Sequence, residues 1–246
     1  MERIDISVLM AVYKKDNPAF LRESLESIFT QTVEAGEVVL LEDGPLTEAL
    51  YEVIKSYQSK YPALRVVAYP VNRGLGKTLN DGLQLCKYDI VARMDADDIC
   101  KSNRFETEYK WLKAHEDYDV IGSWVDEFTN DKTQVRSIRK VPEQYEDIKK
   151  YARYRCPVNH PTVMYRKAAV QAVGGYLTEY FPEDYFLWLR MLKNGCKFHN
   201  IQQSLLWFRY SEATVAKRGG WSYACDEVRI LVRMLKMTSE NAAVCG

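Results

Sequence analysis

The sequence lacks the features that would assign it to several other protein classes. Its six cysteines include no CxxC pair, and no apolar run approaches the ~20 residues needed to span a bilayer. Lysine plus arginine equals aspartate plus glutamate at 34 each, so no net charge attracts nucleic acid. We therefore expect no disulfide framework, no membrane span and no nucleic-acid partner.

The start of the chain also lacks the marks of a secretory signal peptide. Residues 1–5 carry neither a basic region nor a long apolar one, which together with the cysteine usage favours the reducing cytoplasm. Apolar residues make up 47% of the 246 positions, enough for a substantial core. The length fits either one large α/β domain or two merged halves.

The first half alternates between β-rich apolar runs and helical patterns. Expected strands cover residues 4–12, 37–41, 64–69 and 89–94, and expected helices cover 20–30, 49–61 and 75–86. This alternation predicts a mostly parallel central sheet flanked by helices on both faces. The carboxyl ends of its strands would then bring four polar segments, 11–14, 42–44, 72–74 and 95–97, to one edge.

The second half is less regular. We expect a helix near 104–115, a β-rich run at 120–128, a polar stretch at 129–134, and helices near 145–154 and at 185–192. No internal repeat or flexible linker separates the halves. We divide the chain into a nucleotide-binding half at 1–98, an acceptor-binding and catalytic half of the same domain at 99–210, and an amphipathic C-terminal helix within 211–246.

An acidic segment, residues 95–98, follows a short buried strand. Two oxygen donors, Asp95 and Asp97, suit a hard divalent cation that shares phosphate oxygens with a substrate. The alternative is an acidic helix start, with Asp98 or Ser102 as the cap.

Two further segments could bind a nucleotide. Asp43 follows a strand and could accept a hydrogen bond from a ring N–H such as that of uracil, while Gly44 permits close backbone approach; an ordinary β-turn is the alternative. Residues 72–77 offer two cations, two glycines and a helix start, which suit a diphosphate. Their spacing matches neither a P-loop nor a dinucleotide fingerprint.

Catalytic candidates come from the second half. Glu183 and Asp184 precede a helical run whose apolar side chains would hold them in place as bases, or they could simply complement the helix dipole. His160 is either a structural hydrogen-bonding residue or a contact of the substrate. The run at 207–210 is either core packing or a sugar- and phosphate-binding segment.

Six motifs in order give the chain a family resemblance. Residues 6–13, 41–44, 72–74, 94–98, 159–162 and 182–185 together resemble family 2 glycosyltransferases with the GT-A fold. The resemblance spans residues 4 to about 210. It implies a Rossmann-like nucleotide-binding half merged with an acceptor-binding half, and an inverting transferase that uses a nucleotide-diphosphate sugar and Mn²⁺ or Mg²⁺.

The resemblance also implies roles for individual residues. The implied nucleotide-binding residues are Val12, Tyr13, Asp43, Arg73, Asp95 and Ala96. Asp97 would be the principal metal ligand with Asp95 beside it, and Asp184 would be the catalytic base with Glu183 helping to hold the acceptor. The candidate acceptor or donor contacts are His160, Trp188 and Arg209.

The chain departs from the family pattern in places. Glu42 and Pro45 replace an aspartate and a serine of the usual turn around Asp43. Ser211 follows Arg209-Tyr210 where many members carry a histidine, which removes that histidine as a further metal ligand.

The resulting interpretation is a transferase that moves a sugar from a UDP-linked donor to a hydroxyl of a glycan or lipid-linked saccharide, in cell-surface polysaccharide synthesis. A sugar nucleotidyltransferase and an inactive nucleotide-sugar-binding module are the alternatives. Residues 221–237 form an amphipathic pattern that could contact the inner face of a membrane, or pack on the core or on another subunit in a homodimer.

Overall fold

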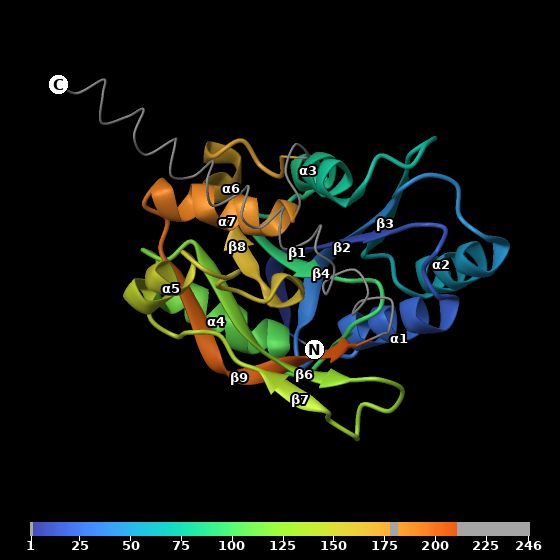
Figure 1. The fold of residues 1–246 in the computed structure, drawn as a ribbon. Coiled ribbons are helices and arrows are strands. Elements are labelled where there is room, and N and C mark those ends of the chain that lie inside the picture. Colours follow the sequence, from blue (N-terminus) through green and yellow to red (C-terminus); the bar gives the residue numbers. More distant parts are fainter. Residues whose placement is uncertain (1, 178–181, 211–246) are drawn as a thin grey trace.

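The computed structural model describes residues 2–177 and 182–210, and its first half is the expected parallel sheet. Strands β1 (Arg3–Val12), β2 (Glu34–Glu42), β3 (Leu64–Ala68) and β4 (Ile90–Met94) pair in the order β3-β2-β1-β4, all parallel (Figure 1). Helices α1 (Pro18–Phe29), α2 (Glu48–Lys60) and α3 (Leu75–Leu85) connect them. The strand–helix alternation predicted from the sequence is confirmed here.

Beyond β4 the sheet is mixed rather than mostly parallel. The path continues β4-β8-β6-β9-β5, and only the β6–β9 pairing is parallel. Its strands are β5 (Ile99–Cys100), β6 (Val120–Phe128), β8 (Met164–Arg166) and β9 (Phe198–Arg209), with β7 (Ser137–Arg139) paired to β6 as an exposed hairpin. One sheet therefore runs through both halves of the chain.

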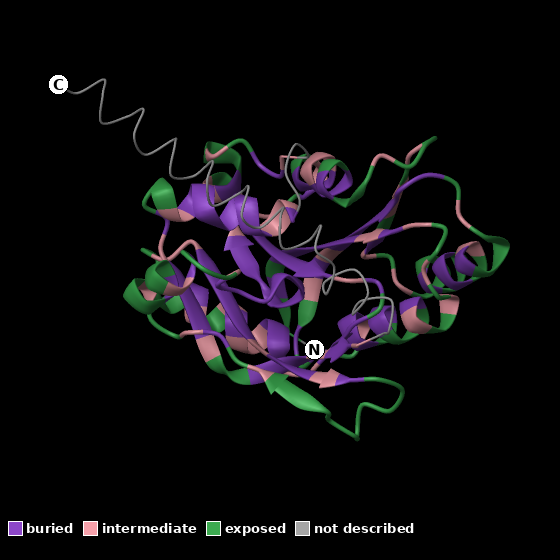
Figure 2. Ribbon diagram, viewed as in Figure 1, coloured by how far each residue is buried: buried purple, intermediate pink, exposed green. Residues whose placement is uncertain are grey.

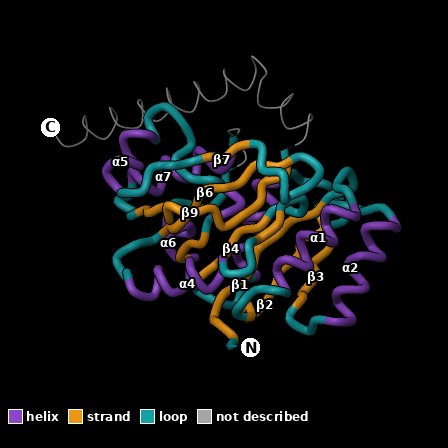
Figure 3. Tube along the Cα trace, turned by 90° about the horizontal axis from the view of Figure 1, so that it is seen from below, coloured by secondary structure: helices purple, strands orange, loops and turns teal. Residues whose placement is uncertain are grey.

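Helices cover both faces of this sheet and define two cores. One core joins the sheet to α1, α2 and α4 (Arg104–Ala114), which lie in front of the strands in Figure 3. The other joins it to α3, α5 (Tyr145–Tyr151), α6 (Lys167–Ala172) and α7 (Glu183–Lys193). Figure 2 shows the central strands buried between these layers, and β7 exposed.

Local sequence explains where the helices begin. Asn17 precedes α1 and its side chain accepts a hydrogen bond from the backbone N–H of Ala19 at 2.9 Å, and Pro18 occupies the first helical position. Thr47 accepts from Leu50 in the same way at α2. A single 3₁₀ turn, η1 (His160–Thr162), leads into β8.

None of the helices in the described part of the chain is long and apolar enough to cross a membrane. The C-terminal helix expected within 211–246, its suggested membrane or subunit contact, and Ser211 lie outside the described residues.

Candidate active site

The loops that follow β1, β2 and β3 meet at one edge of the sheet. The backbone N–H of Asp43 donates to the carbonyl oxygen of Val12 at 2.8 Å. The Asp43 carboxylate accepts hydrogen bonds from the backbone N–H groups of Arg73 and Gly74 at 2.7 and 3.0 Å. The expected convergence of these segments is confirmed, and Asp43 fixes the loop that precedes α3.

Gly44 serves this loop packing. Its φ is +86°, and a Cβ atom there would lie only 2.6 Å from the backbone nitrogen of Asn72. The close backbone approach expected at Gly44 is therefore between two loops of the protein itself.

The guanidinium of Arg73 is already engaged. It stacks 3.5 Å from the centre of the Tyr69 ring, and its Nη1 pairs with Asp81 at 2.7 Å. Arg73 thus links the loop before α3 to Asp81 of that helix, and its binding of a nucleotide stays a prediction.

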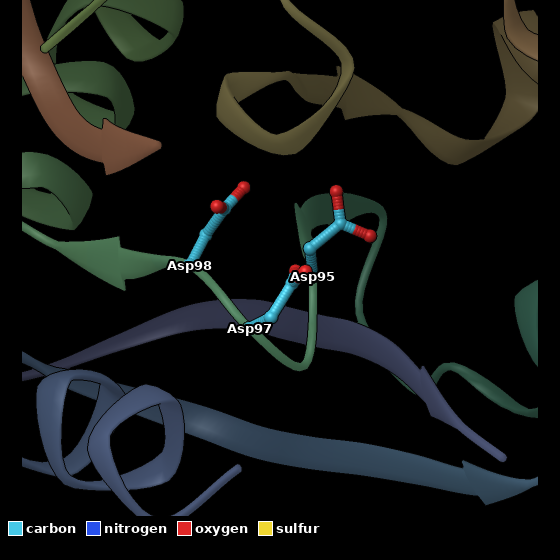
Figure 4. Close-up of side chains that lie close together, drawn as sticks. All are labelled: Asp95, Asp97 and Asp98. Atoms are coloured by element: carbon cyan, nitrogen blue, oxygen red, sulfur yellow. The ribbon is translucent and has the colours of Figure 1, made fainter. Parts of the chain in front are cut away.

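The acidic segment forms the turn between β4 and β5. One carboxylate oxygen each from Asp95, Asp97 and Asp98 lies within 4.8 Å of the others, and the side chains of Asp95 and Asp98 point to the same side of the turn (Figure 4). Burial raises the pKa of Asp97 to about 6, and repulsion from Asp95 adds to the shift. Tyr13, directly after β1, lies near enough to this turn to be affected by its charge. Burial raises the pKa of Tyr13, and the charges of Asp16 and Asp97 add to the shift.

Buried arginines hold this turn from both sides. Arg93, within β4, forms an ion pair with Asp95. From β9, the backbone N–H of Arg209 donates to Asp98 Oδ1 at 2.8 Å and its Nε donates to the carbonyl oxygen of Asp97 at 2.9 Å. Arg209 is 4% exposed, and its Nη2 donates a hydrogen bond to the carboxylate of Glu23 in α1. Arg209 therefore connects the acidic turn to α1.

The alternative account of this segment as a helix start does not hold. The next helix, α4, begins at Arg104, and the residue that precedes it is Asn103. Asp98 bonds to Arg209 rather than to a helix N-terminus.

The three carboxylates fit a divalent cation. Three carboxylates close together in a partly buried site repel one another, and this arrangement is unfavourable unless a positive charge balances theirs. Asp98 Oδ2 is buried and has no hydrogen-bond partner among the described residues, although burial and its two acidic neighbours raise the pKa of this carboxyl well above its usual value. Carboxylate oxygens are the ligands that Mg²⁺ and Mn²⁺ prefer.

One cavity of about 690 Å³ joins the acidic turn to the second acidic pair. Asp95 and Asp97 line it together with Glu183, Asp184 and His160. These five residues come from three separate motifs of the sequence, and the structure brings them together. Leu75, in the first turn of α3, lines the same cavity.

Glu183 and Asp184 occupy the first turn of α7. The residues of α7 that directly follow this pair are buried in the core, and Trp188 among them is fully buried. This packing fixes the acidic pair at the cavity wall, as expected. Burial raises the pKa of Glu183 to about 7, and repulsion from Asp184 contributes.

His160 links this pair to the interior. Its Nδ1 lies 3.9 Å from Asp184 Oδ2, and its Nε2 lies 3.1 Å from the hydroxyl oxygen of Tyr176. Trp188 packs edge-on against the imidazole, with ring centres 5.9 Å apart. Neither Trp188 nor Arg209 is among the residues that line the cavity; they contact His160 and Asp97, which do, and their contact with substrate stays a prediction.

The sequence analysis missed several lining residues. Arg93 carries a visible signal, a charged side chain within an otherwise apolar strand directly before the aspartates. Arg139 ends the short strand β7, and Lys140 and Arg155 lie in irregular segments; these three basic residues carry no such signal. The remaining nucleotide-binding candidates, Val12, Tyr13, Asp43, Arg73 and Ala96, lie outside the lining of this cavity.

A second cavity of about 760 Å³ lies between α1, α2 and the end of β9. Its lining, which includes Tyr57 and Trp207, contains none of the motif residues, so it plays no part in the site.

Comparison with known proteins places the chain in a family. Residues 7–174 match the family described as glycosyl transferase family 2. The chain is 44% identical over 223 residues to the Escherichia coli UDP-Gal:alpha-D-GlcNAc-diphosphoundecaprenol beta-1,3-galactosyltransferase, covering 91% of this chain and 80% of that protein. It is 38% identical to the amylovoran biosynthesis glycosyltransferase AmsE of Erwinia amylovora, covering 91% and 83%.

Solved structures share the fold at lower identity. The mannosyltransferase PcManGT of Pyrobaculum calidifontis, solved with GDP-Man and Mn²⁺, superposes with a TM-score of 0.71 at 15% identity, covering 93% of this chain and 64% of that one. S. aureus TarS 1-349 with UDP-GlcNAc gives a TM-score of 0.66 at 19% identity, covering 85% and 59%. This chain thus spans about 60% of the length of these solved chains, and the expected GT-A fold is confirmed.

Proposed function

The chain belongs to glycosyl transferase family 2, and we propose that it transfers a sugar from a UDP-linked donor to a hydroxyl of a lipid-linked saccharide in polysaccharide synthesis, with inversion at the anomeric carbon. The observation that carries this is the shared cavity: Asp95 and Asp97 line it on one side, and Glu183 and Asp184 on another. If a donor sugar binds between them, Asp95 and Asp97 would lie near its diphosphate, and Glu183 and Asp184 would lie near its reacting carbon.

The acidic turn is the donor side. Asp97, with Asp95 and Asp98 beside it, would hold Mn²⁺ or Mg²⁺, and the bound cation would stabilise negative charge on the leaving diphosphate. Arg93 holds Asp95 in place by its ion pair, and Arg209 holds the backbone of Asp97. Leu75, in the first turn of α3, also lines the cavity, and the N-terminus of a helix favours an anion near it.

Asp184 is the proposed base. It takes the proton of the acceptor hydroxyl while that oxygen forms a bond to the anomeric carbon. The bond from this carbon to the phosphate oxygen breaks, and the nucleoside diphosphate leaves with the electron pair. General-base help of this kind contributes roughly 10²–10⁴ in rate.

Glu183 and His160 support this step. Because burial and Asp184 raise the pKa of Glu183 to about 7, Glu183 is partly protonated near neutral pH and can donate a hydrogen bond to an acceptor hydroxyl. His160 faces Asp184 and is itself oriented by Tyr176.

The relatives support the choice of substrates. The Escherichia coli relative is named for UDP-galactose and a diphosphoundecaprenol-linked GlcNAc, and AmsE for amylovoran biosynthesis. At 44% identity over nine-tenths of this chain, a UDP-linked donor and a lipid-linked acceptor are the first substrates to test.

The test is a panel of nucleotide sugars with Mn²⁺ or Mg²⁺ and a synthetic lipid-linked GlcNAc acceptor. We expect release of UDP and a product one sugar longer, with the new linkage of inverted configuration by NMR. Exchange of pyrophosphate into the donor would instead identify a nucleotidyltransferase. Binding of UDP-sugars without any turnover would identify an inactive binding module.

A further inference from the structure

Among the basic residues that line the cavity, two form no ion pair with an acidic side chain of the described residues. Four basic residues line it: Arg93, Arg139, Lys140 and Arg155. Arg93 pairs with Asp95, and Arg139 Nη2 pairs with Glu127 Oε1 at 2.5 Å. Within residues 2–177 and 182–210, neither Lys140 nor Arg155 takes part in an ion pair with a carboxylate, so both remain available for an anionic ligand.

These two cations belong to the second half of the chain and lie at the exposed margin of the cavity. Lys140 directly follows β7, and Arg155 lies four residues beyond α5; both elements are yellow to yellow-green in Figure 1. Both residues are exposed. The Lys140 Nζ lies 4.7 Å from the centre of the Trp124 ring, whose Nε1 donates to the carbonyl of Val141, so the ammonium has a defined place.

The acidic turn favours a metal ion as its ligand, whereas Lys140 and Arg155 favour an anion. The proposed donor places its diphosphate against the cation site of Asp97, so a second anion-binding place in the same cavity points to negative charge on the acceptor. Arginine binds phosphate oxygens through two parallel N–H groups, and lysine binds them as a point charge. Exposed apolar residues are close to both in the sequence: Tyr154, 75% exposed, precedes Arg155, and Ile138, 50% exposed, lies two positions before Lys140.

We propose that Lys140 and Arg155 bind the diphosphate of an acceptor in which a sugar is joined to a lipid chain through that diphosphate. The inference rests on the proposed transferase function and names the acceptor group that the second half of the cavity recognises. The sugar then lies toward Asp184, and the lipid leaves over the exposed surface at Tyr154 and Ile138.

The first test is direct binding and needs no turnover. Decyl diphosphate, below its critical micelle concentration, is titrated calorimetrically into the wild type, the double variant Lys140→Gln/Arg155→Gln, and the control Lys149→Gln/Arg153→Gln. The control removes the same charge from exposed positions outside the cavity lining. We expect at least about 10-fold weaker binding in the first variant and less than twofold change in the control. Equal weakening in both variants, no weakening in either, or no binding to the wild type would overturn the inference.

The second test compares two acceptors that carry the same sugar, decyl diphosphate-linked GlcNAc and decyl GlcNAc without phosphate. In Lys140→Gln/Arg155→Gln we expect KM to rise about 10-fold or more for the first acceptor only, with kcat and UDP affinity unchanged. A parallel loss of UDP affinity would assign the two cations to the donor and overturn the proposal. Equal KM changes for both acceptors would also overturn it.

The two tests separate this inference from the proposed function. If the wild type transfers to neither acceptor while decyl diphosphate binding depends on Lys140 and Arg155, the transferase function fails and the diphosphate site stands. If transfer proceeds and the variant binds and turns over the diphosphate acceptor normally, the site fails and the transferase function stands.

Discussion

His160 and Asp184 face each other at the wall of the cavity, with His160 Nδ1 3.9 Å from Asp184 Oδ2. The opposite ring nitrogen lies 3.1 Å from the Tyr176 hydroxyl, and Tyr176 is buried. The imidazole thus lies between a buried phenol and the proposed base. We therefore predict that the motif at residues 159–162 acts through the proposed base.

Replacement of His160 by Asn should slow turnover by about 10-fold, because the base loses the group that aims it at the acceptor hydroxyl. Steady-state kinetics should give a lower kcat with unchanged UDP affinity. Tyr176→Phe should have a smaller effect in the same direction. The matched control is His115→Asn, at an exposed histidine stacked on Trp111 outside the cavity, which should keep wild-type kcat. Normal turnover in His160→Asn would remove the positioning role.

Replacement of Asp184 by Asn should leave nucleotide and metal binding intact and lower kcat by about 10²–10⁴-fold, because the amide cannot accept the proton. Calorimetry with UDP and Mn²⁺ measures binding, and single-turnover kinetics measures the chemical step. Asp147→Asn, at an exposed aspartate of α5, is the control for loss of one negative charge. A variant that retains near-normal turnover would refute the assignment of the base.

Removal of divalent cations by a chelator should abolish transfer, and Mn²⁺ or Mg²⁺ should restore it. Asp97→Asn should weaken Mn²⁺ binding, measured by electron paramagnetic resonance, whereas Asp117→Asn, at an exposed aspartate paired with Lys197, should not. Full activity in excess chelator would exclude Asp97 from a metal role.

The stability of the fold should depend on pH through Glu183. Its pKa is about 7 in the folded protein against an ordinary value of 4.5, so the folded state binds its proton more tightly than the unfolded chain does. The stabilisation is complete below about pH 4.5 and is lost as the pH rises through about 7. Glu183→Gln should therefore lose this dependence and gain about 1–3 kcal/mol over the wild type at pH 8.

Thermal unfolding of both proteins between pH 5 and pH 8, in metal-free buffer, measures this difference. The two melting temperatures should diverge as the pH rises. A constant difference across that range would show that Glu183 titrates near its ordinary value.

Substitution of Gly44 by Ala should destabilise the protein by about 1–3 kcal/mol, because it adds both left-handed strain and a contact of 2.6 Å with the Asn72 backbone. Gly195→Ala is the matched control, since Gly195 has a φ of +85° but nothing within 4 Å of the added atom. Urea denaturation should show the larger loss for Gly44→Ala. Equal losses would mean that the loop at 72–74 can move aside.

Local pattern was sufficient to predict the elements of the first half. The strands and helices from β1 to β4 are long enough for periodicity to identify them, and parallel crossovers then dictate which ends meet. The short strands β5 and β8, with two and three residues, carry no such periodicity. Their antiparallel pairing, which makes the second half of the sheet mixed, follows from long-range packing instead.

The residues of the site also differ in whether local sequence pattern was sufficient to predict them. Asp95, Asp97, Glu183 and Asp184 could be predicted because each lies at the start or end of a recognisable element. The support given by Arg209 could not, because it depends on a contact across 112 positions of the chain. Lys140 and Arg155 lie in irregular segments where sequence alone does not fix the direction of a side chain.

The dependence of the acidic turn on Arg209 has a consequence for synthesis of the protein. Asp97 leaves the ribosome long before β9 exists, and until then nothing from that strand holds its backbone or bonds to Asp98. A nascent chain that has formed only the first four strands therefore lacks the contacts from β9 that hold Asp97 and Asp98. Among the described residues, β9 completes the support of the acidic turn, and it is translated more than a hundred codons after Asp97.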